Sequence, residues 1–355
     1  MIYYLMIIGC LATAPLINRK FKISRRSNLD GTMFYVILWG IILISVCGLR
    51  RVDIGRDTAM YQLIYRQIQS SEIWNARTLM YSSHEYGFYF LMYLVSRLFD
   101  YQVFLYLGAI ISIAPVMYVI YKYSDNKPMS LVLYMCFSFY TFCFSGQRQA
   151  MALGVLMIAY CFLREKKLKY YILFVILAVL FHTSAILFLP IYWIDKIQYN
   201  KKTVSIFLLL MVGSYLLRNQ LWSVATLFAR QQYTANDAGG LLMYLFMILT
   251  VVLGLIYRKY FTGKRNENKV YLYLQVLAAC LWPIASVNSA LSRMYMYYQV
   301  FLILYVPALL KSIGNRHQFE RLIVKYGYYA VALYFLVDEV MAPVKQFYPY
   351  YFFWQ

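Results

Sequence analysis

Long apolar runs recur along the whole chain and are separated by short polar segments. A helix needs about 20 mostly apolar residues to cross the hydrocarbon core of a bilayer. The runs span residues 2–17, 32–49, 87–98, 103–121, 129–144, 150–163, 170–181, 184–194, 204–217, 241–257, 270–284, 297–310 and 322–340. The pattern predicts an all-α, polytopic integral membrane protein, with a single transmembrane domain over residues 1–355. We expect about 10–13 transmembrane or re-entrant helices from runs of these lengths.

The composition agrees with this interpretation. Only 14% of the residues are charged and 63% are hydrophobic, whereas soluble domains carry roughly 25% charged and 45–50% apolar residues. A soluble enzyme, a nucleic-acid-binding protein and a disordered chain are therefore excluded. The six cysteines lie inside apolar runs without CxxC spacing, which indicates small buried side chains and neither a disulfide framework nor a zinc site.

The distribution of positive charge predicts an orientation in the membrane. The net charge is +20, and most lysines fall in short segments between apolar runs. These segments are 18–31, 122–127, 164–169, 195–202, 258–269 and 311–325. Cytoplasmic loops carry an excess of Lys and Arg, so we expect all six segments on the cytoplasmic face of the membrane.

The positive charges outside those segments are ten arginines and a single lysine. They are Arg50, Arg51, Arg56, Arg66, Arg77, Arg97, Arg148, Arg218, Arg230, Arg293 and Lys345. A point charge is sufficient for topology, whereas the planar guanidinium favours bidentate recognition of an anion such as phosphate. The bias therefore predicts an anion site on the extracytoplasmic face. The alternative for any single arginine is a side chain that snorkels or pairs with a local carboxylate.

Several of the apolar runs are too short for each to cross the membrane as one helix. We expect residues 50–98 to form an extracytoplasmic loop with short interfacial or re-entrant helices inside it, among them the run 87–98. The runs 129–144 and 150–163 are expected to form a hairpin with its tip near Arg148, and the runs 170–181 and 184–194 a second one with its tip at His182. One long tilted helix through His182 is the alternative to the second hairpin. Because ionisable groups at membrane depth are costly, Arg148 and His182 are functional candidates.

Four short polar motifs are GLRRVDIGRDTAMY at 48–61, EYGF at 85–88, RQAMA at 148–152 and FHTSA at 181–185. Together they resemble the EpsG family of Wzy-like bacterial polysaccharide polymerases. The motifs occur in order with similar spacing over about the first 190 residues, and beyond them only the hydropathy and the Ser292-Arg293 element look similar. Arg56 departs from the pattern, because a small or apolar residue is expected between the glycine and Asp57.

The resemblance implies a multi-pass glycosyltransferase similar to the GT-C-like enzymes that use lipid phosphosugars, with its active site on the extracytoplasmic side. Its donor and acceptor would be oligosaccharides linked to undecaprenyl pyrophosphate, and a chain-length regulator could be a partner. No cofactor, metal or nucleic acid is implied. A transferase that adds one sugar from a lipid-linked donor is the alternative within this class, and a flippase for lipid-linked oligosaccharide is a third hypothesis. The clustering of polar residues toward one face, without inverted repeats, favours an enzyme.

The same resemblance implies roles for individual residues. The acceptor hydroxyl needs a base, for which the candidates are Asp57, Glu85, Asp53 and His182. His182 could instead bind phosphate. The pyrophosphate leaving group needs fixed cations, for which the candidates are Arg51, Arg148 and Arg293, with Arg50 and Arg56. Other parts of the substrate would contact Gln149, Tyr61 and Tyr86.

Overall fold

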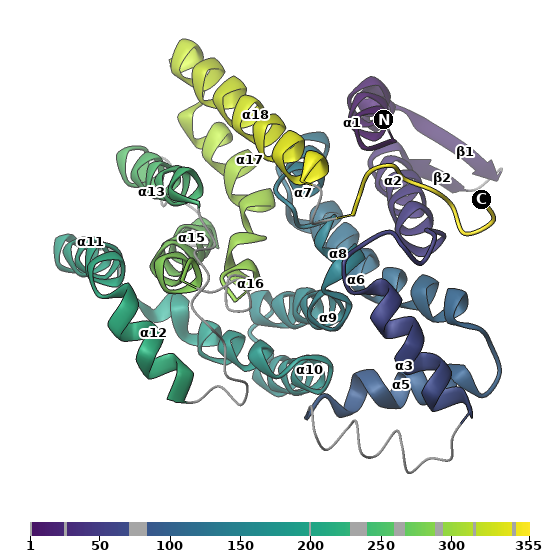
Figure 1. Cartoon of the computed structure of the whole chain (residues 1–355). Coiled ribbons are helices and arrows are strands. Elements are labelled where there is room, and N and C mark those ends of the chain that lie inside the picture. Colours follow the sequence, from purple (N-terminus) through teal and green to yellow (C-terminus); the bar gives the residue numbers. More distant parts are fainter. Residues whose placement is uncertain are drawn as a thin grey trace. The chain divides into compact units, whose positions relative to one another are not determined.

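The structure is a computed structural model that describes residues 2–24, 27–70, 84–198, 200–227, 240–258, 267–287, 294–314, 317–342 and 346–355. The described backbone is almost entirely helical (Figure 1). It divides into two compact units, one formed by Met1–Leu189 with Tyr326–Gln355 and the other by Pro190–Lys325. The expectation of an all-α polytopic membrane protein is confirmed.

Helices of the first unit begin and end close to the predicted apolar runs. They are α1 (Ile2–Thr13), η1 (Ala14–Asn18), α2 (Gly31–Gly48), α3 (Thr58–Ser70), α5 (Tyr86–Ser96), α6 (Tyr101–Tyr123), α7 (Lys127–Cys136), α8 (Phe142–Ser145), α9 (Gln147–Arg164) and α10 (Leu168–Phe181). Helix η2 (Thr183–Lys196) continues into the second unit, and α18 (Gln318–Met341) returns from it. Two of these helices, α2 and α6, are long and apolar enough to cross a membrane.

One feature of the first unit is not helical. Strands β1 (Lys20–Ser24) and β2 (Ser27–Asp30) form an antiparallel hairpin within the basic segment 18–31. Helix α2 follows this hairpin directly and leads to the loop before α3, so the length of α2 lies between the hairpin and α3. The segments that were expected on opposite sides of the membrane are therefore separated by the length of the helices.

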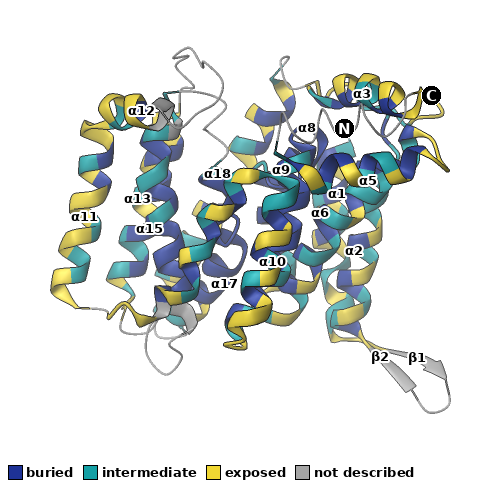
Figure 2. Ribbon diagram, turned by 90° about the horizontal axis from the view of Figure 1, so that it is seen from below, coloured by how far each residue is buried: buried dark blue, intermediate teal, exposed yellow. Residues whose placement is uncertain are grey.

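In the described part of the loop region after α2 there are two short helices, as expected. Helix α3 is amphipathic, and it lies across the end of the upright helices in Figure 2. Helix α5 has only 11 residues, too few to span a bilayer. The buried rings of Tyr61, Tyr65, Phe88 and Phe104 hold both helices against α6.

Both predicted hairpin tips coincide with breaks between helices. The chain turns at Gly146, and α9 starts at Gln147. Helix α10 ends at Phe181, and His182 has an extended backbone before η2 begins. The hydroxyl of Tyr171, near the start of α10, donates to the carbonyl of Phe188 in η2. This contact requires η2 to run back along α10, so the hairpin is correct and the single tilted helix is wrong.

The second unit has its own core. Its helices are α11 (Lys201–Leu216), α12 (Arg218–Leu227), α13 (Leu241–Ile256), α15 (Glu267–Ala285), α16 (Met296–Gln299) and α17 (Leu302–Ile313). Residues Met296–Ile313 form a third helical segment long and apolar enough to span a membrane, and α11 with α12 would add a fourth span, bent by 80°. The Tyr305 hydroxyl of α17 donates to the carbonyl of Thr250 in α13 at 2.8 Å, beside Gly254.

Candidate active site

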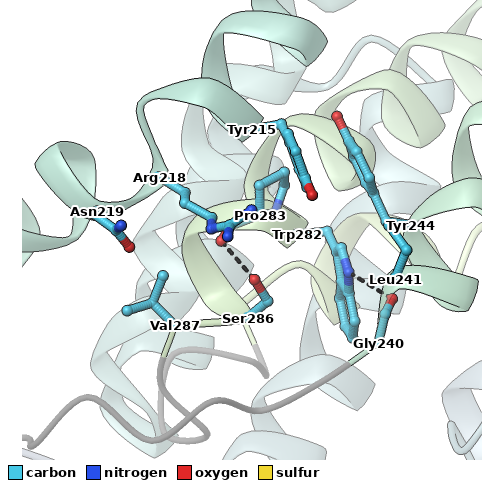
Figure 3. Close-up of a pocket in the computed structure, with 10 residues that line it drawn as sticks. All are labelled: Tyr215, Arg218, Asn219, Gly240, Leu241, Tyr244, Trp282, Pro283, Ser286 and Val287. Carbon is cyan, nitrogen blue, oxygen red and sulfur yellow. Dashed lines mark hydrogen bonds between the residues drawn. The ribbon is translucent and has the colours of Figure 1, made fainter.

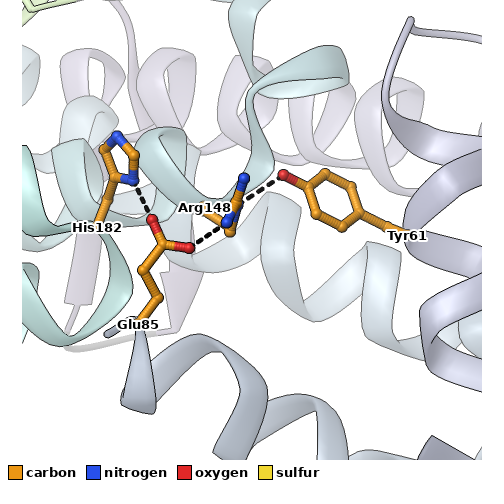
Figure 4. A network of polar contacts seen from close by, with 4 residues as sticks. All are labelled: Tyr61, Glu85, Arg148 and His182. Atoms are coloured by element: carbon orange, nitrogen blue, oxygen red, sulfur yellow. Dashed lines mark hydrogen bonds and ion pairs between the residues drawn. The ribbon is translucent and has the colours of Figure 1, made fainter. Parts of the chain in front are cut away.

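Four polar side chains from distant parts of the sequence meet in the first unit (Figure 4). The two carboxylate oxygens of Glu85 have different partners: Oε2 accepts a hydrogen bond from the Arg148 guanidinium, and Oε1 contacts Nδ1 of His182. The Nε–H of Arg148 donates to the Tyr61 hydroxyl at 2.8 Å. Each of the four sequence motifs contributes one residue to this network.

The backbone brings these side chains together through close helix contacts. Glu85 immediately precedes α5, Arg148 lies in the first turn of α9, and His182 follows the last residue of α10. A Cβ atom on Gly87 would lie 2.9 Å from the Cβ of Leu180, so only glycine lets α5 approach the end of α10 this closely. This approach places Glu85 beside His182.

The network is buried on one side and accessible on the other. The Glu85 side chain is only 4% exposed, whereas those of Arg148 and His182 are 29% and 27% exposed. Tyr61 is buried beneath Arg148, with the guanidinium carbon 5.6 Å from the centre of its ring. Burial raises the pKa of Tyr61 to about 12, so the phenol stays protonated at neutral pH. Glu85 and Tyr61 therefore support two groups that a ligand can reach.

The chemistry of the two exposed groups follows from their partners. An ionised carboxylate only accepts hydrogen bonds, so Nδ1 of His182 carries the proton. Its Nε2 atom is then left to accept a proton from a ligand or, in the imidazolium form, to donate to an anion. Arg148 has five N–H donors, and the described residues use two of them. The network can therefore hold an anion next to a base.

Arg50, predicted as an anion ligand, is 1% exposed and has its donors directed into the protein. Its guanidinium donates to the carbonyls of Cys47, Ile54 and Phe144 and to the Thr58 hydroxyl. The contact with the Phe144 carbonyl fastens the loop after α2 to the hairpin tip that precedes α9. In this structure Arg50 holds the fold and offers nothing to a ligand, so its predicted role is corrected.

Arg51 and Asp53 bind each other near the surface. The guanidinium donates twice to the carboxylate, at 2.8 and 2.7 Å, and stacks on Tyr351 at 4.1 Å. The ion pair lowers the pKa of Asp53 below its ordinary value, and the hydrogen bond to Asp53 raises that of Arg51. Asp53 is the more exposed partner.

The other predicted site residues lie around this network or outside the described part of the chain. The Arg56 side chain is exposed, and its backbone N–H donates to the Ser145 hydroxyl at 3.2 Å. Asp57 precedes α3, one turn before Tyr61. Gln149 is buried in α9, and Tyr86 is 37% exposed at the start of α5. Arg293 lies outside the described residues, so its role stays a prediction.

One part of this region was missed in the sequence. The C-terminal segment 346–355 pairs with the loop after α2: the N–H of Gly55 donates to the carbonyl of Gln346, and that of Phe353 to the carbonyl of Leu49. The dense aromatic run at 347–354 was the available signal. Among the described residues, no three His, Cys, Asp or Glu side chains come together as metal ligands.

The fold and the network define a polytopic helical membrane protein that holds a carboxylate, an imidazole and a guanidinium together. A model of the EpsG family matches residues 32–352, which is nearly the whole chain. The chain therefore belongs to the EpsG family, a family of Wzy-like polymerases, and has a role in polysaccharide polymerisation. No curated protein and no solved structure matches the chain.

Proposed function

We propose that this protein lengthens a bacterial surface polysaccharide on the outer face of the plasma membrane. It transfers the growing glycan from undecaprenyl pyrophosphate to the next lipid-linked repeat unit. The observation that carries the proposal is the convergence of Glu85, Arg148 and His182 in one half-accessible network. The family supports polymerisation in general, and the network supplies the chemistry that this transfer needs.

His182 is the proposed base. Its Nε2 atom takes the proton from an acceptor hydroxyl, whose oxygen forms a bond to the anomeric carbon of the donor. The bond from that carbon to the pyrophosphate oxygen breaks, and the lipid pyrophosphate leaves with the electron pair. Glu85 keeps the imidazole in the tautomer that this step requires and stabilises the imidazolium that forms, as in other carboxylate–histidine pairs.

Arg148 is the proposed ligand of the leaving group. Negative charge builds up on the pyrophosphate as the glycosidic bond breaks, and a fixed guanidinium stabilises it without reorganisation. Tyr61 and Glu85 hold the guanidinium from two directions, so its orientation is fixed before substrate binds. Arg51, Arg56 and Arg293 are proposed as further cations for the second phosphate, and Asp57 as a group near the acceptor.

A gel of surface polysaccharide from cells with and without the protein tests this function. We expect the ladder of chain lengths to collapse to single repeat units when the protein is absent. Wild-type protein should restore the ladder, whereas Arg148→Ala and His182→Ala should not, although both stay in the membrane at normal levels. A product one sugar shorter would indicate a single-sugar transferase. Repeat units trapped on the inner leaflet would indicate a flippase.

A further inference from the structure

The second unit contains a pocket of about 530 Å³ that is separate from the Glu85 network (Figure 3). It lies where the chain bends by 80° between α11 and α12, and α13 and α15 provide its other walls. This volume is within the roughly 300–1,000 Å³ of small-ligand sites. The pocket has aromatic walls and an arginine at its edge.

The aromatic walls are held in place by contacts within the unit. The Tyr215 and Tyr244 rings stack at 5.3 Å and are nearly parallel, and the Tyr244 hydroxyl donates to the carbonyl of Met211 at 2.8 Å. The indole N–H of Trp282 donates to the carbonyl of Gly240 at 3.2 Å. Gly240 has φ +104°, and a Cβ atom there would lie 2.4 Å from the indole, so this wall requires glycine.

Arg218 supplies the charge. Its guanidinium stacks on the Tyr215 ring at 4.7 Å. Stacking fixes the plane of the guanidinium and leaves its N–H edges available, which is the arrangement that binds phosphate or carboxylate in bidentate fashion. Asn219 and the Ser286 hydroxyl add polar groups to the same lining.

These features point to one class of ligand. A lipid acyl chain would fit a wholly apolar cavity, and an inorganic anion does not need walls of tyrosine and tryptophan. Rigid aromatic surfaces next to a guanidinium, an amide and a hydroxyl suit a sugar ring that carries a negative group. We propose that this pocket binds an anionic saccharide, either a phosphorylated sugar or a sugar acid. In the cell this would be part of the polymer or repeat unit, an identification that rests on the proposed function.

Photo-crosslinking in cells that make the polysaccharide tests the pocket without relying on activity. The photoreactive amino acid benzoylphenylalanine replaces Val287 in the pocket lining or, as a matched control, Val224, which is 52% exposed on α12 and does not line the pocket. After irradiation, mass spectrometry identifies what each position has captured. We expect a saccharide with a phosphate or carboxylate at position 287 and none at position 224.

Two substitutions show whether the proposed groups hold the ligand. Arg218→Ala and Trp282→Ala should each lower capture at position 287 roughly tenfold, the effect of losing about 1.4 kcal/mol of binding free energy. Arg218 is partly exposed, so its replacement leaves the folded unit in place even if that of Trp282 does not. Capture of a phospholipid at position 287, or of a saccharide whose yield neither substitution changes, would overturn the proposal.

Addition of His182→Ala separates this proposal from the proposed function. If both are correct, polymerisation stops and saccharide capture at position 287 persists. If polymerisation is lost in this variant and no saccharide is captured at position 287 either with or without His182→Ala, only the pocket proposal is overturned. Continued polymerisation with specific capture overturns only the catalytic role of the Glu85 network.

Discussion

The loop after α2 and the start of α9 both place an arginine in an apolar environment, but with opposite results. Arg50 is 1% exposed and donates to three backbone carbonyls and a hydroxyl. The side chain of Arg148 is 29% exposed and shares a carboxylate with His182. An arginine that is buried and whose donors are directed into the protein stabilises a fold. An arginine that is held by a carboxylate and a phenol, and that has further N–H donors, can bind a ligand.

The two regions are also physically connected. Arg50 and the Thr58 hydroxyl both donate to the Phe144 carbonyl, four residues before Arg148. The loop thus fixes the position of the hairpin tip from which α9 starts. Changes at the buried loop positions Arg50 and Gly55 should therefore act on stability, and changes in the network should act on catalysis.

The largest effect is expected from Glu85→Gln. The amide keeps the shape of the carboxylate but loses the charge that pairs with Arg148 and selects the tautomer of His182. We expect the rate of polymerisation to fall by a factor on the order of 100 or more, because His182 is then no longer oriented as a general base. Polymerisation of lipid-linked repeat units by purified protein measures this rate.

The matched control for this experiment is Glu165→Gln. Glu165 follows α9 at its other end and pairs with Lys122 and Lys167 near the surface. Its replacement should leave the rate within about twofold, because exposed ion pairs contribute little. Equal rates in both variants would remove Glu85 from the mechanism.

Arg50→Ala should have the next largest effect, on stability. Its removal takes a charged donor away from three buried carbonyls and opens a cavity, so we expect a loss of about 3 kcal/mol in the free energy of unfolding. Thermal unfolding in detergent measures the loss, and activity per folded molecule should stay close to that of the wild type. Arg56→Ala, in which the lost side chain is exposed, should change the stability by less than about 0.5 kcal/mol. A stable but inactive Arg50→Ala protein would contradict the comparison.

Gly55→Ala should lower the free energy of unfolding by about 1–3 kcal/mol relative to the wild type. We expect this loss to be smaller than that of Arg50→Ala. Gly55 has φ +93°, and a Cβ atom would lie 2.3 Å from the Phe144 carbonyl oxygen. The same substitution at Gly213, a helical position with no atom within 4 Å of the new Cβ, should be neutral or stabilising. If the two substitutions had the same effect on thermal unfolding, the loop would not be docked on the hairpin tip as described.

Much of this architecture could be predicted from the sequence, because local pattern determines it. The apolar runs gave the helices, and polar residues that interrupt them marked both hairpin tips, at Arg148 and His182. The pairing of residues across the fold could not be predicted in the same way. Glu85 contacts His182 across 97 positions, and Arg50 contacts the Phe144 carbonyl across 94. Such contacts depend on how helices pack, which is why all the arginines of the first motif were expected to bind the same anion.

The smallest effect is expected from the exposed pair of Arg51 and Asp53. The pair lowers the pKa of Asp53, so its contribution to stability is present above the ordinary pKa of an aspartate, about 4, and is lost as pH falls through the lowered value. We therefore expect Asp53→Asn to lower the melting temperature slightly at pH 7 and to have no effect at a pH below that lowered pKa. Glu165→Gln provides a control for general titration of surface carboxylates. A destabilisation that persists undiminished in acid would show that Asp53 acts through packing, as Arg50 does, and not through its charge.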